Sequence, residues 1–165
     1  MRNILSAVCS VLVALLVLAP ARAASSQDLP NFTGKWSLDV AKSDFGPMPP
    51  PESMTYVVDH KEPAIKIVTT QKGQQGETTN ERNVTTDGKD NVNKLRMPTG
   101  EQDVTSTTKW AGKTLTTSFK LDVQGMALSV VESWKLSDDG KVLTVLRDIG
   151  TDQGNFAVTT VFNKQ

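Results

Sequence analysis

The sequence has very few of the residues that carry thiol, metal or charge-driven chemistry. It contains one cysteine, Cys9, and one histidine, His60. A single cysteine excludes an internal disulfide, and a metal site would need two or three ligands at fitting spacing. The 18 basic and 18 acidic residues cancel, which excludes a basic field for nucleic acid. We therefore expect no metal site, no cofactor and no nucleic-acid partner.

Long apolar runs are lacking beyond the N-terminus. Residues 1–23 carry a positive charge near their start, at Arg2, continue with a short apolar run and end with small residues at Ala21 and Ala23, which is typical of a secretory signal peptide cut after Ala23. The run is shorter than the roughly 20 residues that span a bilayer. Cys9 lies inside it, so no cysteine stands at the cleavage point to carry a lipid. We expect a secreted or periplasmic monomer without a stable membrane anchor.

No internal repeat, charge run or linker divides the remaining chain. Residues 24–30 are expected to form a flexible tail, and residues 31–165 are long enough for a single domain with a sizeable core. The only compositionally biased segment, Gly46–Pro51, favours an extended polyproline connection.

Apolar residues recur at every second position after residue 30. Between Phe32 and Val40 they alternate with polar residues, which is typical of a half-buried strand. The same alternation recurs over residues 115–121, 126–136 and 156–162. Asp87-Gly88 and Asp139-Gly140 fall between such runs and favour hairpin turns, because glycine accepts a positive φ. We predict an all-β fold, an antiparallel up-and-down β-barrel of about 8–10 strands, because closure leaves no exposed edge.

Three turns set a strand register when apolar residues are placed opposite apolar residues. The polar residues 77–97 allow no such assignment. The predicted pairs are Leu136–Leu143, Trp134–Val145 and Glu132–Arg147 across the first turn; Leu121–Met126, Phe119–Leu128 and Thr117–Val130 across the second; and Ile149–Phe156, Arg147–Val158 and Val145–Thr160 across the third.

Gly34 and Trp36 share the inward face of the first strand, where the tryptophan is expected to plug one end of the barrel. Gly34-Lys35-Trp36 resembles the Gly-x-Trp signature that calycins, the lipocalins and fatty-acid-binding proteins, carry near the start of their first strand. The segment 110–115 is similar to a turn of the fatty-acid-binding proteins. The chain therefore resembles secreted, lipocalin-like proteins of bacteria, and the resemblance implies a lipocalin-like barrel.

The resemblance also implies roles for particular positions. Lipocalins place an arginine over the first-strand tryptophan, and Arg147 matches that position. Fatty-acid-binding proteins hold a carboxylate with an Arg-x-Tyr pair on the last strand, where this chain has Thr160 and Phe162. Their two-helix lid is replaced by residues 41–52, a segment too short and too rich in proline for two helices.

The expected inner face carries more hydroxyl groups than a solid core should. Buried hydroxyls need partners, so they indicate either a cavity with water or an amphipathic ligand, or bonds to the backbone. The candidate ligand-binding residues are Tyr56, Ser106, Thr108, Thr117, Phe119, Leu128, Val130, Glu132, Arg147, Val158 and Thr160.

Glu132 and Arg147 interrupt two apolar faces and are predicted to lie opposite each other. A buried ion pair is energetically costly unless both charges are hydrogen-bonded, so its presence indicates a specific structural or functional role. It could anchor a ligand headgroup, form a salt bridge at the barrel end, or let Arg147 cap Trp36. His60, at a strand end, is expected at the rim.

No serine, cysteine or lysine has a base at a recognisable spacing, so we expect no enzyme. The sequence favours binding or transport of a small apolar or amphipathic molecule in the barrel interior. The alternative is a periplasmic protein-binding or inhibitor barrel. An interior cavity would favour the first hypothesis, and a solid core the second.

Overall fold

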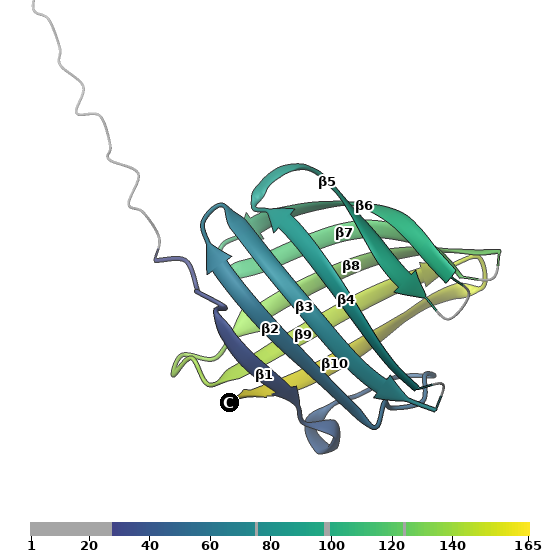
Figure 1. Cartoon of the computed structure of the whole chain (residues 1–165), viewed down its shortest axis with the longest axis horizontal. Helices are drawn as coiled ribbons and strands as arrows, with labels where there is room; N and C mark the ends of the chain where they lie inside the picture. Colours follow the sequence, from purple (N-terminus) through teal and green to yellow (C-terminus); the bar gives the residue numbers. More distant parts are fainter. Residues whose placement is uncertain (1–27, 75, 98–99, 124) are drawn as a thin grey trace, which may run out of the picture.

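The computed structural model describes residues 28–74, 76–97, 100–123 and 125–165, which form a single barrel of antiparallel strands (Figure 1). The expected signal peptide, residues 1–23, and residues 24–27 of the expected tail lie outside the described residues. In the part of the chain that is described, no helix has the length and apolarity to cross a membrane.

Ten strands and one short 3-10 turn follow one another along the chain. The turn is η1 (Val40–Lys42), between the first two strands. The strands are β1 (Gly34–Leu38), β2 (Ser53–Lys61), β3 (Ala64–Gly73), β4 (Gly76–Thr85), β5 (Asp87–Met97), β6 (Gly100–Ala111), β7 (Thr114–Val123), β8 (Met126–Leu136), β9 (Val142–Thr151) and β10 (Gly154–Lys164).

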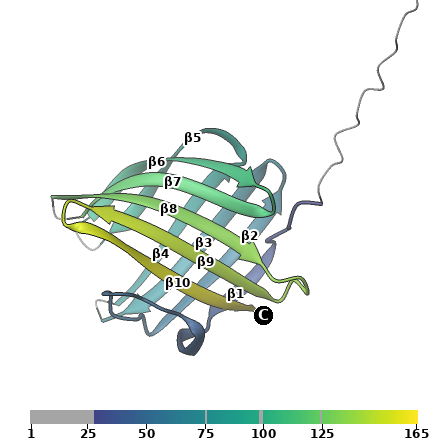
Figure 2. The same cartoon turned by 180° about the vertical axis from the view of Figure 1, so that it is seen from behind.

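The strands pair in the order β4-β3-β2-β1-β10-β9-β8-β7-β6-β5, with every neighbouring pair antiparallel. Pairing of β1 with β10 curls the sheet, so that β1–β4 form one wall and β6–β10 the other (Figures 1 and 2). The predicted all-β, up-and-down barrel is confirmed, and it is closed except for one seam between β4 and β5.

Two asparagine side chains bridge the seam in place of a strand ladder. Asn80 accepts from the backbone N–H of Arg96 at 2.6 Å and donates to its carbonyl at 3.1 Å. Asn93 accepts from the backbone N–H of Asn83 at 2.7 Å and donates to its carbonyl at 3.0 Å. Each amide therefore satisfies both backbone groups of one residue on the opposite edge, Arg96 in one case and Asn83 in the other.

Two of the three predicted hairpin registers are confirmed. Glu132 lies opposite Arg147 across β8 and β9, and Arg147 lies opposite Val158 across β9 and β10. The predicted register across β7 and β8 is wrong by two residues, because Phe119 lies opposite Val130, and the strands continue to a closing pair between Val123 and Met126. A shift of two residues keeps every side chain on its face, so apolar matching could not detect it.

The predicted hairpin at Asp87-Gly88 is also wrong. These residues begin β5, where a register shift between Asp87 and Asp90 marks an irregularity in the pairing with β6. β4 and β5 are neighbours along the chain but do not pair, so their connection joins the two edges of the sheet. The hairpin predicted at Asp139-Gly140 does join β8 and β9, and Gly140 has a φ of +68° there.

One end of the barrel, here called the plugged end, is filled by aromatic side chains. The plugged end carries the β2–β3, β6–β7 and β8–β9 turns, on the left in Figure 1. Trp36 is fully buried and donates from Nε1 to the carbonyl of Phe32 at 2.9 Å. Phe32 is also fully buried, and its ring stacks on His60 and on Trp110, each with ring centroids 5.8 Å apart. Trp36 is thus buried where the sequence predicted a plug.

His60 lies in this core, so the prediction of a rim position is wrong. The side chain is 2% exposed, because the residues preceding β1 fold over it. Its Nδ1 accepts from the backbone N–H of Phe32 at 3.2 Å, and its Nε2 lies 2.9 Å from Oε1 of Glu62. Since a backbone N–H can only donate, Nδ1 carries no proton and Nε2 donates to Glu62.

The opposite end, here called the open end, carries the β3–β4, β5–β6, β7–β8 and β9–β10 turns together with the β1–β2 connection. That connection contains η1, a turn at Gly46 and Pro47 closed by a 3.0 Å hydrogen bond from Met48 N–H to the carbonyl of Phe45, and an irregular segment through Pro51. Asp44 pairs with Thr159 of β10, which holds the connection against the barrel wall. The expected lack of a two-helix lid is confirmed for residues 41–52.

Candidate functional site

A cavity of about 500 Å³ occupies the barrel interior toward the open end. Strands from both walls and the β1–β2 connection contribute to its lining, because alternate residues of each strand point inward. The lining residues are Phe45, Met48, Pro49, Pro51, Met54, Tyr56, Thr69, Gln71, Asn80, Arg82, Leu95, Phe119, Leu121, Glu132, Arg147, Val158 and Thr160.

The inner part of the cavity is polar and charged. Glu132, on β8, is 2% exposed and accepts three hydrogen bonds. Arg147 donates from Nε to Oε2 at 2.7 Å, Arg82 donates from Nη2 to Oε1 at 3.0 Å, and Trp134 donates from Nε1 to Oε1 at 2.8 Å. The carboxylate therefore binds two guanidinium groups from opposite walls of the barrel. These hydrogen bonds and opposite charges offset the cost of removing the carboxylate from water.

Tyr56 extends this cluster. Its hydroxyl accepts from Nη2 of Arg147 at 2.6 Å, and its ring stacks between Trp134 and Phe162 at centroid distances of 5.4 and 4.5 Å. The hydroxyl proton has no acceptor among the described residues. Tyr56 therefore offers a further donor at the base of the cavity, on a ring whose position is fixed by stacking.

The two arginines keep N–H groups available to the cavity. Within the part of the chain that the structure describes, Arg82 makes a single side-chain hydrogen bond, to Glu132. Arg147 also reaches Thr160 Oγ1 from Nη1 at 3.5 Å, a long contact. Their side chains are 14% and 19% exposed, against 3% for Glu132. The carboxylate thus lies underneath, and the guanidinium groups face the cavity.

The electrostatics of the cluster follow from its geometry. Burial would raise the pKa of Glu132, but the charges of Arg82 and Arg147, with hydrogen bonds from Arg82 and Trp134, lower it to about 2. Burial raises the pKa of Tyr56, so the phenol is neutral. Although burial disfavours the Arg147 cation, contacts with Tyr56 and Glu132 raise its pKa overall. The cluster at neutral pH is two cations and one anion.

The outer part of the cavity is mainly apolar. Met54, Leu95 and Leu121 extend from three different strands, and Phe45 and Met48 come from the β1–β2 connection. Methionine side chains adapt to irregular shapes, which suits a surface that receives a flexible apolar chain. The cavity therefore has a cationic base and an apolar outer section.

The cavity brings together part of the residue set predicted from the sequence. Ser106 instead lies near Asn91, with a 3.5 Å contact to its carbonyl, and Thr108 and Thr117 bond to each other at 2.9 Å. Leu128 and Val130 belong to the apolar cluster beside the cavity and are not among its lining residues. The predicted residues that line it are Tyr56, Phe119, Glu132, Arg147, Val158 and Thr160.

Sequence reasoning missed Arg82 and the residues from the β1–β2 connection. Arg82 lies on β4, within a stretch that is polar on both faces, so no alternation separated its inward side chain from its neighbours. The one available signal was Val84, an apolar residue two positions away that shares its face and is 3% exposed.

The cation over the Trp36 ring is Lys164, whose Nζ lies 5.2 Å from the ring centroid. The interpretation in which Arg147 caps Trp36 is therefore wrong, since its guanidinium bonds to Glu132 and Tyr56 instead. Gly34 has a φ of +145°, a backbone conformation that residues with a side chain rarely adopt, and this explains the glycine at that position.

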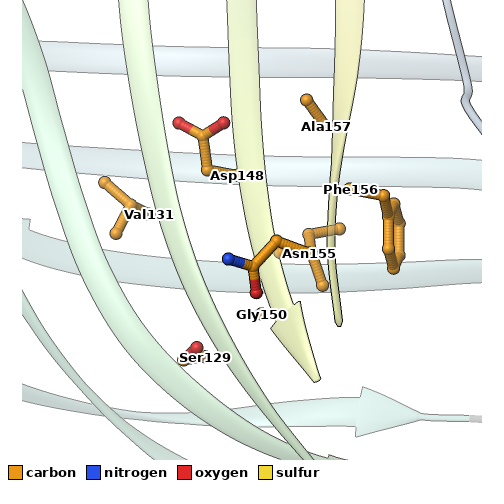
Figure 3. A pocket seen from close by; sticks show the side chains of 8 residues that line it. Ser129, Val131, Asp148, Gly150, Asn155, Phe156 and Ala157 are labelled. Carbon is orange, nitrogen blue, oxygen red and sulfur yellow. The ribbon is translucent and has the colours of Figure 1, made fainter. Parts of the chain in front are cut away.

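A depression of about 510 Å³ lies on the outer face of β8, β9 and β10 (Figure 3). Gly150 is one of its lining residues, and a Cβ there would lie 2.5 Å from Oγ of Ser129. Ser129, Asp148 and Asn155 around it are exposed. No buried polar group points into it, so it lacks the convergent groups found in the interior. Among the described residues no cluster of histidine, cysteine, aspartate or glutamate is suited to a metal.

Comparison with solved structures identifies the fold. A zebrafish ileal bile acid-binding protein, solved as a complex with cholic acid, matches with a TM-score of 0.53 and 17% identity over 81% of this chain and 98% of that chain. A variant of the fluorescent protein UnaG matches with a TM-score of 0.51 and 13% identity, over 81% and 96% of the two chains. The chain has the fold of the calycin barrels. Identities this low establish the fold alone, and neither a protein-family model nor a curated protein matches the sequence.

Proposed function

We propose that this calycin-like barrel binds a small amphipathic molecule in its interior cavity, with an acidic headgroup at Arg82 and Arg147. The observation that carries the proposal is a pair of half-buried guanidinium groups with unused N–H donors at the base of a cavity that is otherwise mainly apolar. The arginines receive the headgroup, and Met54, Leu95 and Leu121 contact the apolar body.

The charge of the cluster supports an acidic headgroup. Two cations share one carboxylate, which leaves one positive charge without a counter-charge at the base of the cavity. A charge held partly away from water without a counter-charge is destabilising, and a bound anion would reduce that penalty. Guanidinium also offers the forked donors that match carboxylate and sulfonate oxygens.

The size of the cavity supports a ligand of modest length. Its volume of about 500 Å³ falls within the range of about 300–1,000 Å³ that is usual for small-molecule sites. The two functions considered from the sequence make different predictions about an interior cavity, because a protein-binding barrel would need none. The presence of the cavity favours small-molecule binding over that alternative.

The structural neighbours support the same class of function by analogy of fold. One of them is named as a bile acid-binding protein and was solved with cholic acid, an amphipathic acid. The apolar residues 1–23, with their small residues near Ala23, support an extracytoplasmic site of action, which is part of the proposal.

A fluorescence titration with anilinonaphthalene sulfonate, an amphipathic anion, tests the proposal. We expect saturable binding by the native protein and displacement by decanoate. Leu121→Trp, which fills the outer cavity, should abolish binding and retain the native melting curve. The matched control is Leu146→Trp on the outer barrel face, where Leu146 is 36% exposed. Equal binding by both variants would place the probe on the surface and contradict the proposal.

A further inference from the structure

We propose that Glu132 determines how much negative charge the cavity accepts, so that a headgroup with one negative charge is selected over a dianion. This inference rests on the proposed function, since it concerns the headgroup of the same ligand. Among the residues that line the cavity, the charged side chains are Arg82, Glu132 and Arg147. Their charges leave one net positive charge.

Glu132 makes a constant contribution of one negative charge to this net charge. All three of its hydrogen bonds come from protein donors, Arg82, Arg147 and Trp134. Its side chain is 3% exposed, against 14% and 19% for Arg82 and Arg147, so the two guanidinium groups present more of their surface to the cavity than the carboxylate does. Glu132 is therefore a positioning residue that supplies a permanent counter-charge and holds the arginines at its two oxygens.

A monoanion would make the base of the cavity neutral. A dianion would leave one negative charge unpaired, close to the Glu132 carboxylate and away from water. Charges interact strongly where water is excluded, and like charges in one site disfavour ionisation or binding. A neutral headgroup would leave the arginine charge uncompensated. The cavity should therefore prefer one negative charge over both none and two.

The experiment uses three ligands that share a decyl chain. Decyl phosphate is a dianion at about pH 8.5, because the second pKa of a phosphate monoester is about 6. Decyl methyl phosphate keeps the same tetrahedral group but carries one negative charge, and decanol carries none. Calorimetric titration of the full mature protein gives an affinity for each ligand, so the charge of the headgroup is varied while the decyl chain is constant.

We expect the wild-type protein to bind decyl methyl phosphate at least about tenfold more tightly than decyl phosphate. Glu132→Gln raises the net charge of the site by one and should shift this ratio by about tenfold or more toward the dianion. Glu81→Gln is the matched control. Glu81 is exposed and pairs with Lys66 at 2.9 Å on the outside of β4, so its replacement changes the total charge equally but should leave the ratio unchanged.

A second variant covers the case in which Glu132→Gln does not fold. Arg82→Gln removes one positive charge from the site and should shift preference from the monoanion toward decanol. Equal affinity of the wild-type protein for the two phosphates would overturn the inference and leave the proposed function standing. The same conclusion follows if Glu81→Gln shifts the ratio as much as Glu132→Gln. Failure of the wild-type protein to bind any of the three ligands would overturn the proposed function as well.

Discussion

Glu132 and Arg147 lie directly opposite each other on β8 and β9, joined by a 2.7 Å hydrogen bond from Nε to Oε2. Arg82 reaches the other carboxylate oxygen from β4, on the facing wall of the barrel. Glu132 and Arg147 alone would form a neutral pair, and Arg82 adds one positive charge to it. The cluster becomes a site with one excess positive charge, facing a cavity that is mainly apolar.

Acid should remove the stabilisation that ionised Glu132 provides. Its pKa is about 2 in the folded protein and near the ordinary 4.5 when unfolded, so the folded state favours the ionised form. The contribution is present above about pH 4.5 and is lost as the pH falls toward about 2, for a total of about 3 kcal/mol. Denaturant unfolding of wild type and Glu132→Gln between these pH values measures it.

The stability difference between these two proteins should narrow steadily as the pH falls. Other carboxyls titrate in both proteins, so the difference isolates Glu132. Parallel stability curves would show that its ionised form is not favoured by folding.

Trp36 should behave as a core residue of the plugged end. Trp36→Ala removes a fully buried ring and its hydrogen bond to Phe32, which is expected to lower the free energy of unfolding by about 3–5 kcal/mol. Val92→Ala is the control, since Val92 is 66% exposed and should change stability by less than about 0.5 kcal/mol. Similar denaturation midpoints for both variants would contradict the plug.

His60 should hold the segment before β1 in place. His60→Phe keeps a ring that can stack on Phe32 but removes the Nδ1 acceptor of the Phe32 backbone N–H. An unpaired buried N–H is expected to reduce stability by about 1–3 kcal/mol. Hydrogen exchange at the Phe32 amide should become faster than in wild type. Unchanged exchange at that amide would mean that the ring nitrogen does not fix the segment.

The seam between β4 and β5 should depend on its two asparagines. Asn93→Ala removes both hydrogen bonds to the backbone of Asn83 and is expected to destabilise the barrel by about 1–3 kcal/mol. Exchange at the Asn83 amide should increase, as followed by NMR. Asn155→Ala, at an exposed position on β10, is the control and should have little effect. Equal exchange rates at the Asn83 amide in the two variants would show that the Asn93 side chain does not stabilise the contact between β4 and β5.

Alternation of apolar and polar residues was sufficient to predict the barrel and much of one wall. It placed Glu132 opposite Arg147 because apolar residues flank both positions on β8 and β9. It failed between β7 and β8, where Phe119 lies opposite Val130 and not Leu128, since a shift of two residues preserves both faces.

The remaining features depend on residues that lack such a pattern. β4 and β5 are largely polar on both faces, so Val84 alone indicated the inward position of Arg82, and nothing indicated the role of Asn80 at the seam. The burial of His60 depends on Phe32 folding over it from a segment outside the strands. These contacts form between distant parts of the chain, and local periodicity carries no signal for them.

The most direct test of the account is a carbon-13 NMR titration of carboxyl-labelled decanoate bound to the protein. If the carboxylate lies between Arg82 and Arg147, its bound resonance should stay at the ionised position well below the usual carboxyl pKa of about 4.5, because the guanidinium groups favour the anion. A bound resonance that titrates like free decanoate would place the headgroup in water at the open end, and would contradict the central claim.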